Sequence, residues 1–256
     1  MKSLFRWGYT LGLLGSAILG SSVIGNLQAL ALPQAQIVER LQTVPVFTIT
    51  DQQGAPLVAA SNNQSNRAVA GVFISQQDAQ AFVDKLKIEN PDLGRSVKVQ
   101  PVSLGDVYTL SQESQSKPNG LDFAYVPVQQ QVDAAVAVLK ATGQPVQQFN
   151  GVPLFVARGG KENSYLTIQQ GNQQVIPFFF DKEQLQVMLD RFKQQQPDMA
   201  NTVQIQVVNL EGVIETLKKS TDQGLNSIVL VPSRESIKFL RSLPATNNQQ
   251  QQRPNN

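Results

Sequence analysis

The second half of this 256-residue chain repeats the pattern of its first half. Short motifs recur in the same order: Val-Pro-Val-Phe (residues 44–47) as Val-Pro-Leu-Phe (152–155), Gly-Val-Phe-Ile-Ser (71–75) as Pro-Phe-Phe-Phe-Asp (177–181), Asn-Pro-Asp (90–92) as Gln-Pro-Asp (196–198), and Tyr-Val-Pro (125–127) as Leu-Val-Pro (230–232). The offset between copies changes little, as small loop deletions would produce. A duplicated unit of this length predicts a pseudo-twofold molecule, and it favours a binding scaffold over a single asymmetric catalytic pocket.

Residues 1–31 have the three-part pattern of a secretory signal peptide. Lys2 and Arg6 make a positively charged start, residues 8–25 are largely apolar and uncharged, and Ala-Leu-Ala at 29–31 supplies the small residues of a cleavage site. An uncleaved membrane anchor is the alternative, but the glycines and serines that interrupt the apolar stretch favour cleavage. We therefore expect an exported mature protein in the periplasm or, since a general export leader serves both, in the thylakoid lumen.

The composition excludes several kinds of chemistry. The chain contains no cysteine and no histidine, so disulfides, thiolate catalysis, Ser-His mechanisms and histidine–zinc sites are impossible. Lys2 and Arg6 would leave with the leader, and the remaining acidic and basic residues are then equal in number. Such a surface lacks the basic stripe that nucleic-acid binding needs. We expect no cofactor, no metal site, no nucleic-acid partner and no membrane span after cleavage.

Composition and periodicity divide the rest of the chain into four parts. Residues 32–43 predict a short amphipathic helix, because their apolar side chains recur at helical spacing. Residues 44–143 and 144–243 are expected to form the first and second repeat lobes. Residues 244–256 are dominated by glutamine and asparagine and predict a disordered tail.

Each lobe is expected to begin with a hairpin and a buried strand and then to enter a helix. Ser75 with Asp78, and Asp181 with Gln184, have the three-residue spacing of a capping box at the start of these helices. Strands and helices alternate without the strict rhythm of a doubly wound fold. The predicted class is therefore α+β: an internally duplicated, pseudo-twofold, mixed β-sheet with packed helices.

None of the candidate catalytic motifs has the spacing and sequence context that its chemistry requires. Ser114 and Lys117 match the Ser-x-x-Lys spacing of serine acyltransferases, but Pro-Asn-Gly follows at once, so the two side chains are not expected on successive turns of one helix. Arg-Gly-Gly-Lys at 158–161 lacks the spacing of a phosphate loop and predicts a turn. Two carboxylate pairs lie at predicted helix starts, where negative charge is stabilising: Asp181 with Glu183, and Glu211 with Glu215. We expect the protein not to be an enzyme.

Residues 178–180 are three consecutive phenylalanines in a predicted strand. Side chains of a strand alternate between its faces, so Phe179 should oppose both of its neighbours. One interpretation is a sheet covered on both faces, and the other is a partly open apolar groove for extended polypeptide. The second interpretation gives seven candidate polypeptide-binding residues: Phe178, Phe180, Leu154, Phe155, Val72, Phe73 and Ile74.

The leader, the Val-Pro-Val-Phe start, the strand–helix junctions at 71–75 and 177–181, and the Tyr-Val-Pro and Leu-Val-Pro strand ends together resemble the Tic-twenty-two-like family. The family is named after the chloroplast inner-envelope translocon, and this chain is similar to its cyanobacterial periplasmic members from about Leu32 to Leu243. The resemblance implies a soluble, non-enzymatic, pseudo-twofold α+β protein with apolar pockets on its two sides. It transfers no individual functional residue.

The resemblance also implies a role. Plastid members lie between the envelope membranes and assist precursor import, and cyanobacterial members are associated with outer-membrane biogenesis. We expect a periplasmic chaperone-like factor that assists protein transport by binding unfolded or outer-membrane precursor proteins, together with the envelope assembly machinery. The alternative is a non-enzymatic structural adaptor that docks on folded envelope translocation or assembly proteins.

Overall fold

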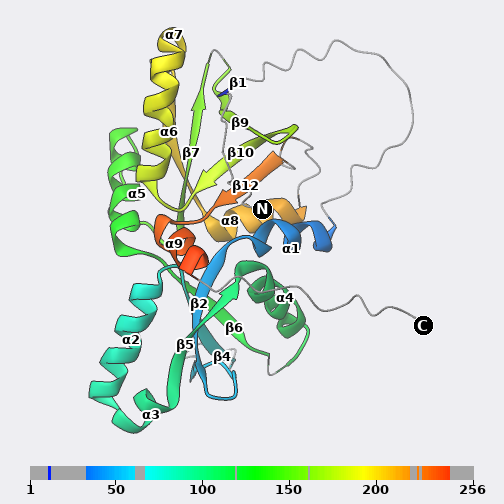
Figure 1. Ribbon diagram of the computed structural model, residues 1–256, viewed down its shortest axis with the longest axis vertical. Coiled ribbons are helices and arrows are strands. Elements are labelled where there is room, and N and C mark those ends of the chain that lie inside the picture. Colours follow the sequence, from blue (N-terminus) through cyan, green and yellow to red (C-terminus); the bar gives the residue numbers. More distant parts are fainter. Residues whose placement is uncertain are drawn as a thin grey trace, which may run out of the picture.

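The computed structural model describes residues 11–12, 33–60, 67–118, 120–160, 162–219, 224 and 227–242. Most of the predicted leader and all of the predicted tail lie outside these residues. Within them, strands and helices build two mixed sheets, and Figure 1 shows the second sheet above the first. The α+β class, with mixed sheets and packed helices, is therefore confirmed.

The first sheet has the order β3-β4-β2-β5, and β6 pairs with the other edge of β4. β2 lies antiparallel to β4 and β5, β3 lies antiparallel to β4, and β6 runs parallel to β4. The strands span β2 (Pro45–Asp51), β3 (Val58–Ala60), β4 (Ala68–Phe73), β5 (Val97–Ser103) and β6 (Asp122–Val126).

The second sheet has the order β1-β9-β10-β7-β11, with β12 paired to β10 and β8 paired to β7. β7 lies antiparallel to β10 and β11, β9 lies antiparallel to β10, and β12 runs parallel to β10. The strands span β1 (Leu11–Gly12), β7 (Pro153–Gly159), β8 (Ser164–Tyr165), β9 (Thr167–Gln170), β10 (Gln173–Phe179), β11 (Gln204–Asn209) and β12 (Ile228–Val231).

The two sheets pair their strands in the same way. β6, β4, β2 and β5 of the first sheet correspond in order and direction to β12, β10, β7 and β11 of the second. Three of the four recurring motif pairs lie on or at the ends of these strands, and the fourth, Asn-Pro-Asp with Gln-Pro-Asp, lies at the junctions of α2 with α3 and of α6 with α7. The ancestral duplication and the pseudo-twofold relation themselves stay predictions.

The helices begin close to where capping and periodicity predict them. The Ser75 hydroxyl accepts a hydrogen bond from the backbone N–H of Asp78 at 3.1 Å, as expected of a helix cap. The described helices span α1 (Gln34–Gln42), α2 (Gln76–Glu89), α3 (Pro91–Ser96), α4 (Leu104–Gln115), α5 (Gln129–Ala141), α6 (Lys182–Gln195), α7 (Pro197–Ala200), α8 (Leu210–Lys219) and α9 (Arg234–Ser242).

Asp181 departs from the predicted capping box. Its carboxylate caps no N–H of α6; instead, Oδ2 accepts the backbone N–H of Arg234, at the start of α9, at 2.8 Å. The same oxygen also accepts the side-chain amide of Gln184 at 2.9 Å. The sequence could not reveal this partner, because Arg234 is distant along the chain and approaches only when α9 starts beside α6.

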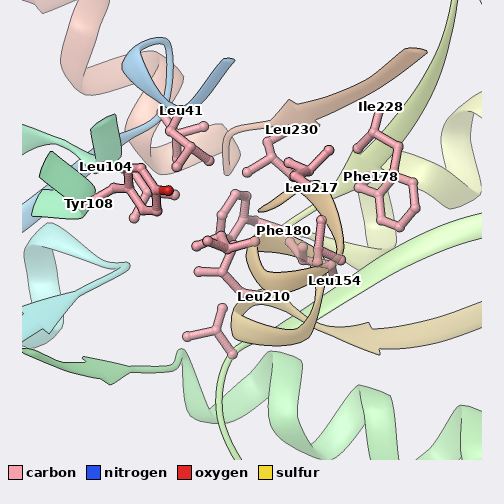
Figure 2. Close-up of a cluster of buried hydrophobic side chains, with 14 of the residues drawn as sticks. Leu41, Leu104, Tyr108, Leu154, Phe178, Phe180, Leu210, Leu217, Ile228 and Leu230 are labelled. Atoms are coloured by element: carbon pink, nitrogen blue, oxygen red, sulfur yellow. The ribbon is translucent and has the colours of Figure 1, made fainter. Parts of the chain in front are cut away.

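The largest apolar cluster lies under α1, α4 and α8, on the face of each sheet that these helices cover, which we call the inner face. It joins β2 and β4 of the first sheet with β7, β10 and β12 of the second, and α1, α4 and α8 cover it. Figure 2 shows its labelled side chains converging from both halves of the chain: Leu41, Leu104, Tyr108, Leu154, Phe178, Phe180, Leu210, Leu217, Ile228 and Leu230. Both halves therefore bury apolar area against each other, which is the main favourable term in folding.

The last helix of each predicted lobe packs on the sheet of the other lobe. α5 follows β6 of the first sheet but contacts β7 and β11 of the second, where Ala135 joins the cluster of Phe155 and Leu185. α9 follows β12 of the second sheet but contacts β2, and the ring of Phe239 meets the ring of Phe47 edge-on at 5.2 Å. Figure 1 shows α5 beside α6 and α9 at the middle of the molecule. The two sheets are thus tied together by a reciprocal exchange of helices.

Hydrogen bonds close this exchange at the helix starts. The side-chain oxygen of Gln131 on α5 accepts the backbone N–H of Lys182 on α6 at 3.0 Å, and its amide donates to Glu183 at 2.9 Å. In the first half, the carboxylate of Glu235 on α9 accepts the backbone N–H of Gln77 on α2 at 2.9 Å. Each exchanged helix therefore supplies an acceptor for an N–H that the recipient helix cannot satisfy itself.

We predict that Gln131→Ala lowers the free energy of unfolding by about 1–3 kcal/mol at neutral pH, because it leaves the Lys182 N–H without this acceptor. Burial works to raise the pKa of Glu183, but the hydrogen bonds from Gln131 and from a backbone N–H, with nearby positive charge, outweigh it and lower that pKa. A carboxylate whose pKa is lowered by folding stabilises the folded state at pH values above its ordinary pKa. This contribution is lost as the pH falls through the lowered pKa.

The difference in free energy of unfolding between wild type and Gln131→Ala should therefore be largest near neutral pH and become smaller below about pH 4. Urea unfolding at several pH values measures it. Gln129→Ala is the matched control, since Gln129 is exposed on the same helix and bonds to Asp133 of that helix. Equal losses for the two variants would contradict the role of Gln131 at the junction.

A second prediction concerns α9. Phe239→Ala should lower the free energy of unfolding by about 1–3 kcal/mol, because it removes a partly buried ring from the outer face of the first sheet. Leu240→Ala is the control, since the neighbouring Leu240 is 44% exposed, and it should change stability little. If both variants unfold at the same urea concentration as wild type, α9 does not hold the two sheets together.

Candidate functional site

The seven apolar residues proposed from sequence as a polypeptide-binding groove are all buried, with at most 6% of any side chain exposed. Phe178, Phe180, Leu154, Val72 and Ile74 lie in the cluster on the inner faces, whereas Phe155 and Phe73 lie on the opposite, outer faces. Phe179 opposes its two neighbours, as the strand alternation predicts. The open-groove expectation for these residues is therefore corrected.

The reason is that helices cover both faces of each sheet. α1, α4 and α8 cover the inner faces, α5 and α6 cover the outer face of the second sheet, and α2 and α9 lie on the outer face of the first. On each outer face one of the two helices, α5 or α9, comes from the other half of the chain, which local sequence patterns do not reveal. The other interpretation from sequence, a sheet covered on both faces, is the arrangement observed.

An open hollow instead lies where α5 ends beside the edge of β11. Its volume is about 520 Å³, and it is lined by Val138, Ala141, Thr142, Gly143, Gln204 and Ile205. A smaller hollow of about 110 Å³ lies between α6 and β11, lined by Gln186, Leu189, Phe192, Lys193, Val203 and Ile205. Ile205 lines both, so we call the two hollows together the Ile205 groove.

The Ile205 groove combines apolar side chains with an open strand edge. Val138, Val203 and Ile205 are partly buried members of the outer cluster of the second sheet. Among the described residues β11 has one strand partner, β7, so its outer edge is not covered by another strand. An edge of this kind presents backbone N–H and C=O groups to a second chain. The groove can therefore offer both apolar contact and backbone hydrogen bonds.

No local sequence pattern marks these groove residues. Val203, Ile205 and Val207 alternate along β11, which is typical of a strand. This alternation could not indicate exposure, because the covering helix α5 comes from the first half of the chain. The amphipathic patterns of α5 and α6, combined with an edge position for β11, are the features that could have indicated a groove here.

The backbone carbonyls of Ser114 and Lys117 accept hydrogen bonds from the side chain of Arg67. Arg67 donates from Nη2 to the Ser114 carbonyl at 3.1 Å and from Nη1 to the Lys117 carbonyl at 3.0 Å, and its Nε donates to Asp122 at 2.7 Å. α4 ends at Gln115, so Lys117 lies beyond the helix and the acyltransferase geometry is not formed. Arg67 instead satisfies carbonyl groups at the end of α4, a common use of arginine.

The carboxylate pairs also serve local contacts. Asp181 and Glu183 belong to the helix exchange, and Glu215 forms ion pairs with Lys218 and Lys219. Hydrogen bonding to Lys219 and Lys218 lowers the pKa of Glu215 despite a small opposing effect of burial. Burial, with a contribution from the charge of Glu211, raises the pKa of Tyr125 to about 12, so this phenol stays protonated at neutral pH.

The segment after β7 forms a turn, as its composition predicts. The guanidinium of Arg158 lies 4.6 Å from the centre of the Tyr165 ring, and Gly160 takes a φ of 78°, which favours glycine. The backbone N–H of Gly160 donates to Thr202 at 2.9 Å. Lys161, the last residue of the candidate anion motif, lies outside the described residues.

The described residues contain neither a cluster of possible metal ligands nor a helix that could span a membrane. No group of three or more acidic side chains lies close enough to hold a metal ion in this part of the chain. No helix there is both long and apolar enough to cross a bilayer.

Comparison with known proteins gives close relatives of this fold. Anabaena Tic22, a structure described with the words protein transport, superposes with a TM-score of 0.74 at 36% identity and covers 83% of this chain and 98% of its own. Tic22 from Plasmodium falciparum superposes with a TM-score of 0.61 at 23% identity, covering 80% and 95%, and so supports the fold.

Plant relatives are more distant in sequence. Protein TIC 22-like, chloroplastic, from Arabidopsis thaliana is 28% identical over 200 residues, which is 77% of this chain but 60% of the relative. Protein TIC 22, chloroplastic, from Pisum sativum is 23% identical over 205 residues, covering 80% and 75%. The model of the Tic22-like family matches residues 14–242, nearly the whole of the chain, and the chain therefore belongs to the Tic22-like family.

Proposed function

We propose that this protein is a non-enzymatic, chaperone-like factor of the periplasm that assists protein transport and outer-membrane biogenesis by binding precursor polypeptides. The Ile205 groove is the observation that carries this proposal, because it joins apolar side chains to an open strand edge. Its clients would be unfolded or outer-membrane precursor proteins, which expose apolar side chains and unpaired backbone at the same time.

The groove suits an extended chain of no fixed sequence. Backbone hydrogen bonds to an edge strand do not depend on the side chains of the client, and shallow apolar hollows accept side chains of several sizes. Lys193 is the one charged side chain among the described lining residues, so the groove has little charge with which to select a client. These properties fit transient binding of many precursors better than recognition of one folded partner.

Family membership supports the same proposal. Anabaena Tic22 is described with the words protein transport, and the plant relatives are named as chloroplastic. The export pattern of residues 1–31 is the reason for placing this chain in the periplasm. The absence of histidine and cysteine supports a non-enzymatic role, since it removes the most common nucleophilic and acid–base pairs.

Charged substitutions in the groove test the proposal. Ile205→Asp and, separately, Val138→Asp should each weaken binding of a urea-unfolded outer-membrane barrel protein by about tenfold or more, because a carboxylate would have to be desolvated beneath the client. Fluorescence anisotropy of the labelled client after dilution from urea measures the affinity, and circular dichroism confirms that each variant is folded.

Val187→Asp is the matched control. Val187 lies on α6, is 47% exposed and does not line the groove, so the same change of charge should leave client binding within about twofold of wild type. Unchanged affinity in both groove variants would refute this site. The adaptor alternative predicts a different result: deletion of residues 246–256 would abolish association with envelope assembly proteins while unfolded-client binding stays intact.

A further inference from the structure

A short strand from the N-terminal region lies on the edge of β9. β1 (Leu11–Gly12) pairs antiparallel with β9 (Thr167–Gln170), with Leu11 opposite Ile168 and Gly12 opposite Thr167. The other edge of β9 pairs with β10. Figure 1 shows β1 at the upper end of the second sheet, next to β9. Residues that the sequence assigns to a leader therefore complete one end of this sheet.

The edge exists because the second sheet divides at this end. β10 meets β7 at Phe179 and Phe155, but farther along β7 pairs with β8, and β10 pairs with β9 instead. This division leaves one side of β9 to accept another strand. Ile168 is buried at this position, so an added strand would extend an ordered part of the sheet.

The corresponding strand of the first sheet offers a contrast. β3 (Val58–Ala60) pairs with the equivalent stretch of β4, and all three of its side chains are exposed. Within the described residues no strand lies on its other edge. Strand addition is therefore seen on β9 and not on its counterpart, although the two strands occupy the same place in their sheets.

The sequence around β1 has the chemistry of an added strand. Residues 8–25 contain no charged side chain and only small or apolar residues near Leu11 and Gly12, apart from Tyr9 and Thr10. Pairing at a strand edge is made by backbone groups, so a different extended apolar segment could replace these two residues. The segment is also in the same molecule as the edge, which raises its effective concentration to the millimolar range.

We propose that the edge of β9 is a strand-acceptor site for an extended apolar polypeptide segment, and that β1 (Leu11–Gly12) blocks this site in the full-length chain. The block is intramolecular and made mainly by backbone hydrogen bonds, so removal of the leader releases it. The step from acceptor to client rests on the proposed chaperone-like function. The acceptor site would give the sheet that carries the Ile205 groove a second binding edge, at β9. The block would keep this edge closed in the precursor, which still carries its leader.

Proline substitution in the blocking strand tests the inference in the full-length protein. Leu11→Pro together with Gly12→Pro removes two backbone N–H groups and disfavours strand pairing, while no residue of β9 is changed. The probe is a fluorescein-labelled synthetic peptide with the sequence of residues 8–16. The doubly substituted protein should bind it at least about tenfold more tightly than wild type, because the intramolecular competitor has been removed.

A peptide with proline at the positions of Leu11 and Gly12 is the matched control, and it should not bind to either protein. Amide hydrogen exchange over residues 167–170 provides a second measurement: it should be faster in the substituted protein and should slow again when the peptide is added. Equal peptide affinity for wild type and variant, or equal binding of the proline peptide, would overturn the strand-acceptor site.

Competition separates this inference from the function on which it rests. A urea-unfolded barrel protein that displaces the peptide from the substituted protein supports a client role for β9. Failure to displace a peptide that itself binds overturns that client role, even when Ile205→Asp shows that clients use the Ile205 groove. If the doubly substituted protein binds the unfolded client but not the peptide, the acceptor site is overturned and the proposed function is unaffected.

Discussion

The apolar cluster that α1, α4 and α8 cover on the inner faces of both sheets is the interaction on which the rest of the structure depends. Leu154 and Phe178 of the second sheet share it with Val46 and Val72 of the first. α1 contacts α4, α8 and β12, so it joins the two halves over a surface that would be costly to expose to water. The two halves are therefore one cooperative core, although the sequence divides them into two similar stretches.

The exchange of α5 and α9 follows from that arrangement and determines where the working surface lies. With the inner faces covered by α1, α4 and α8, each outer face needs its own cover, and each is covered partly by a helix from the other half. α5 ends near Gly143, beside β11, and leaves the hollow that Ile205 lines. A second-half surface is thus formed by a first-half helix, so the proposed client site depends on the exchange being intact.

The second sheet presents two edges with different occupancy. β11 has an open edge beside the Ile205 groove, whereas the edge of β9 is taken by Leu11–Gly12. Exposed edges carry a risk of unwanted pairing, and proteins commonly cover them. For a protein proposed to hold unfolded chains, the same property is useful if it is controlled. Covering one edge with a segment that export would remove is a simple form of such control.

Local patterns in the chain were enough to predict the α+β class, the start of α2 at Ser75 and the opposition of Phe179 to its neighbours. Each of these depends on periodicity or on contacts within a few residues. They could not indicate that Phe178 and Phe180 are buried, that Asp181 accepts an N–H from α9, or that Ile205 lines a groove. Burial and edge exposure depend on which distant helix covers a strand. For Ile205 that helix is α5 from the first half of the chain, and for Asp181 the partner is α9. Long-range packing alone decides both contacts.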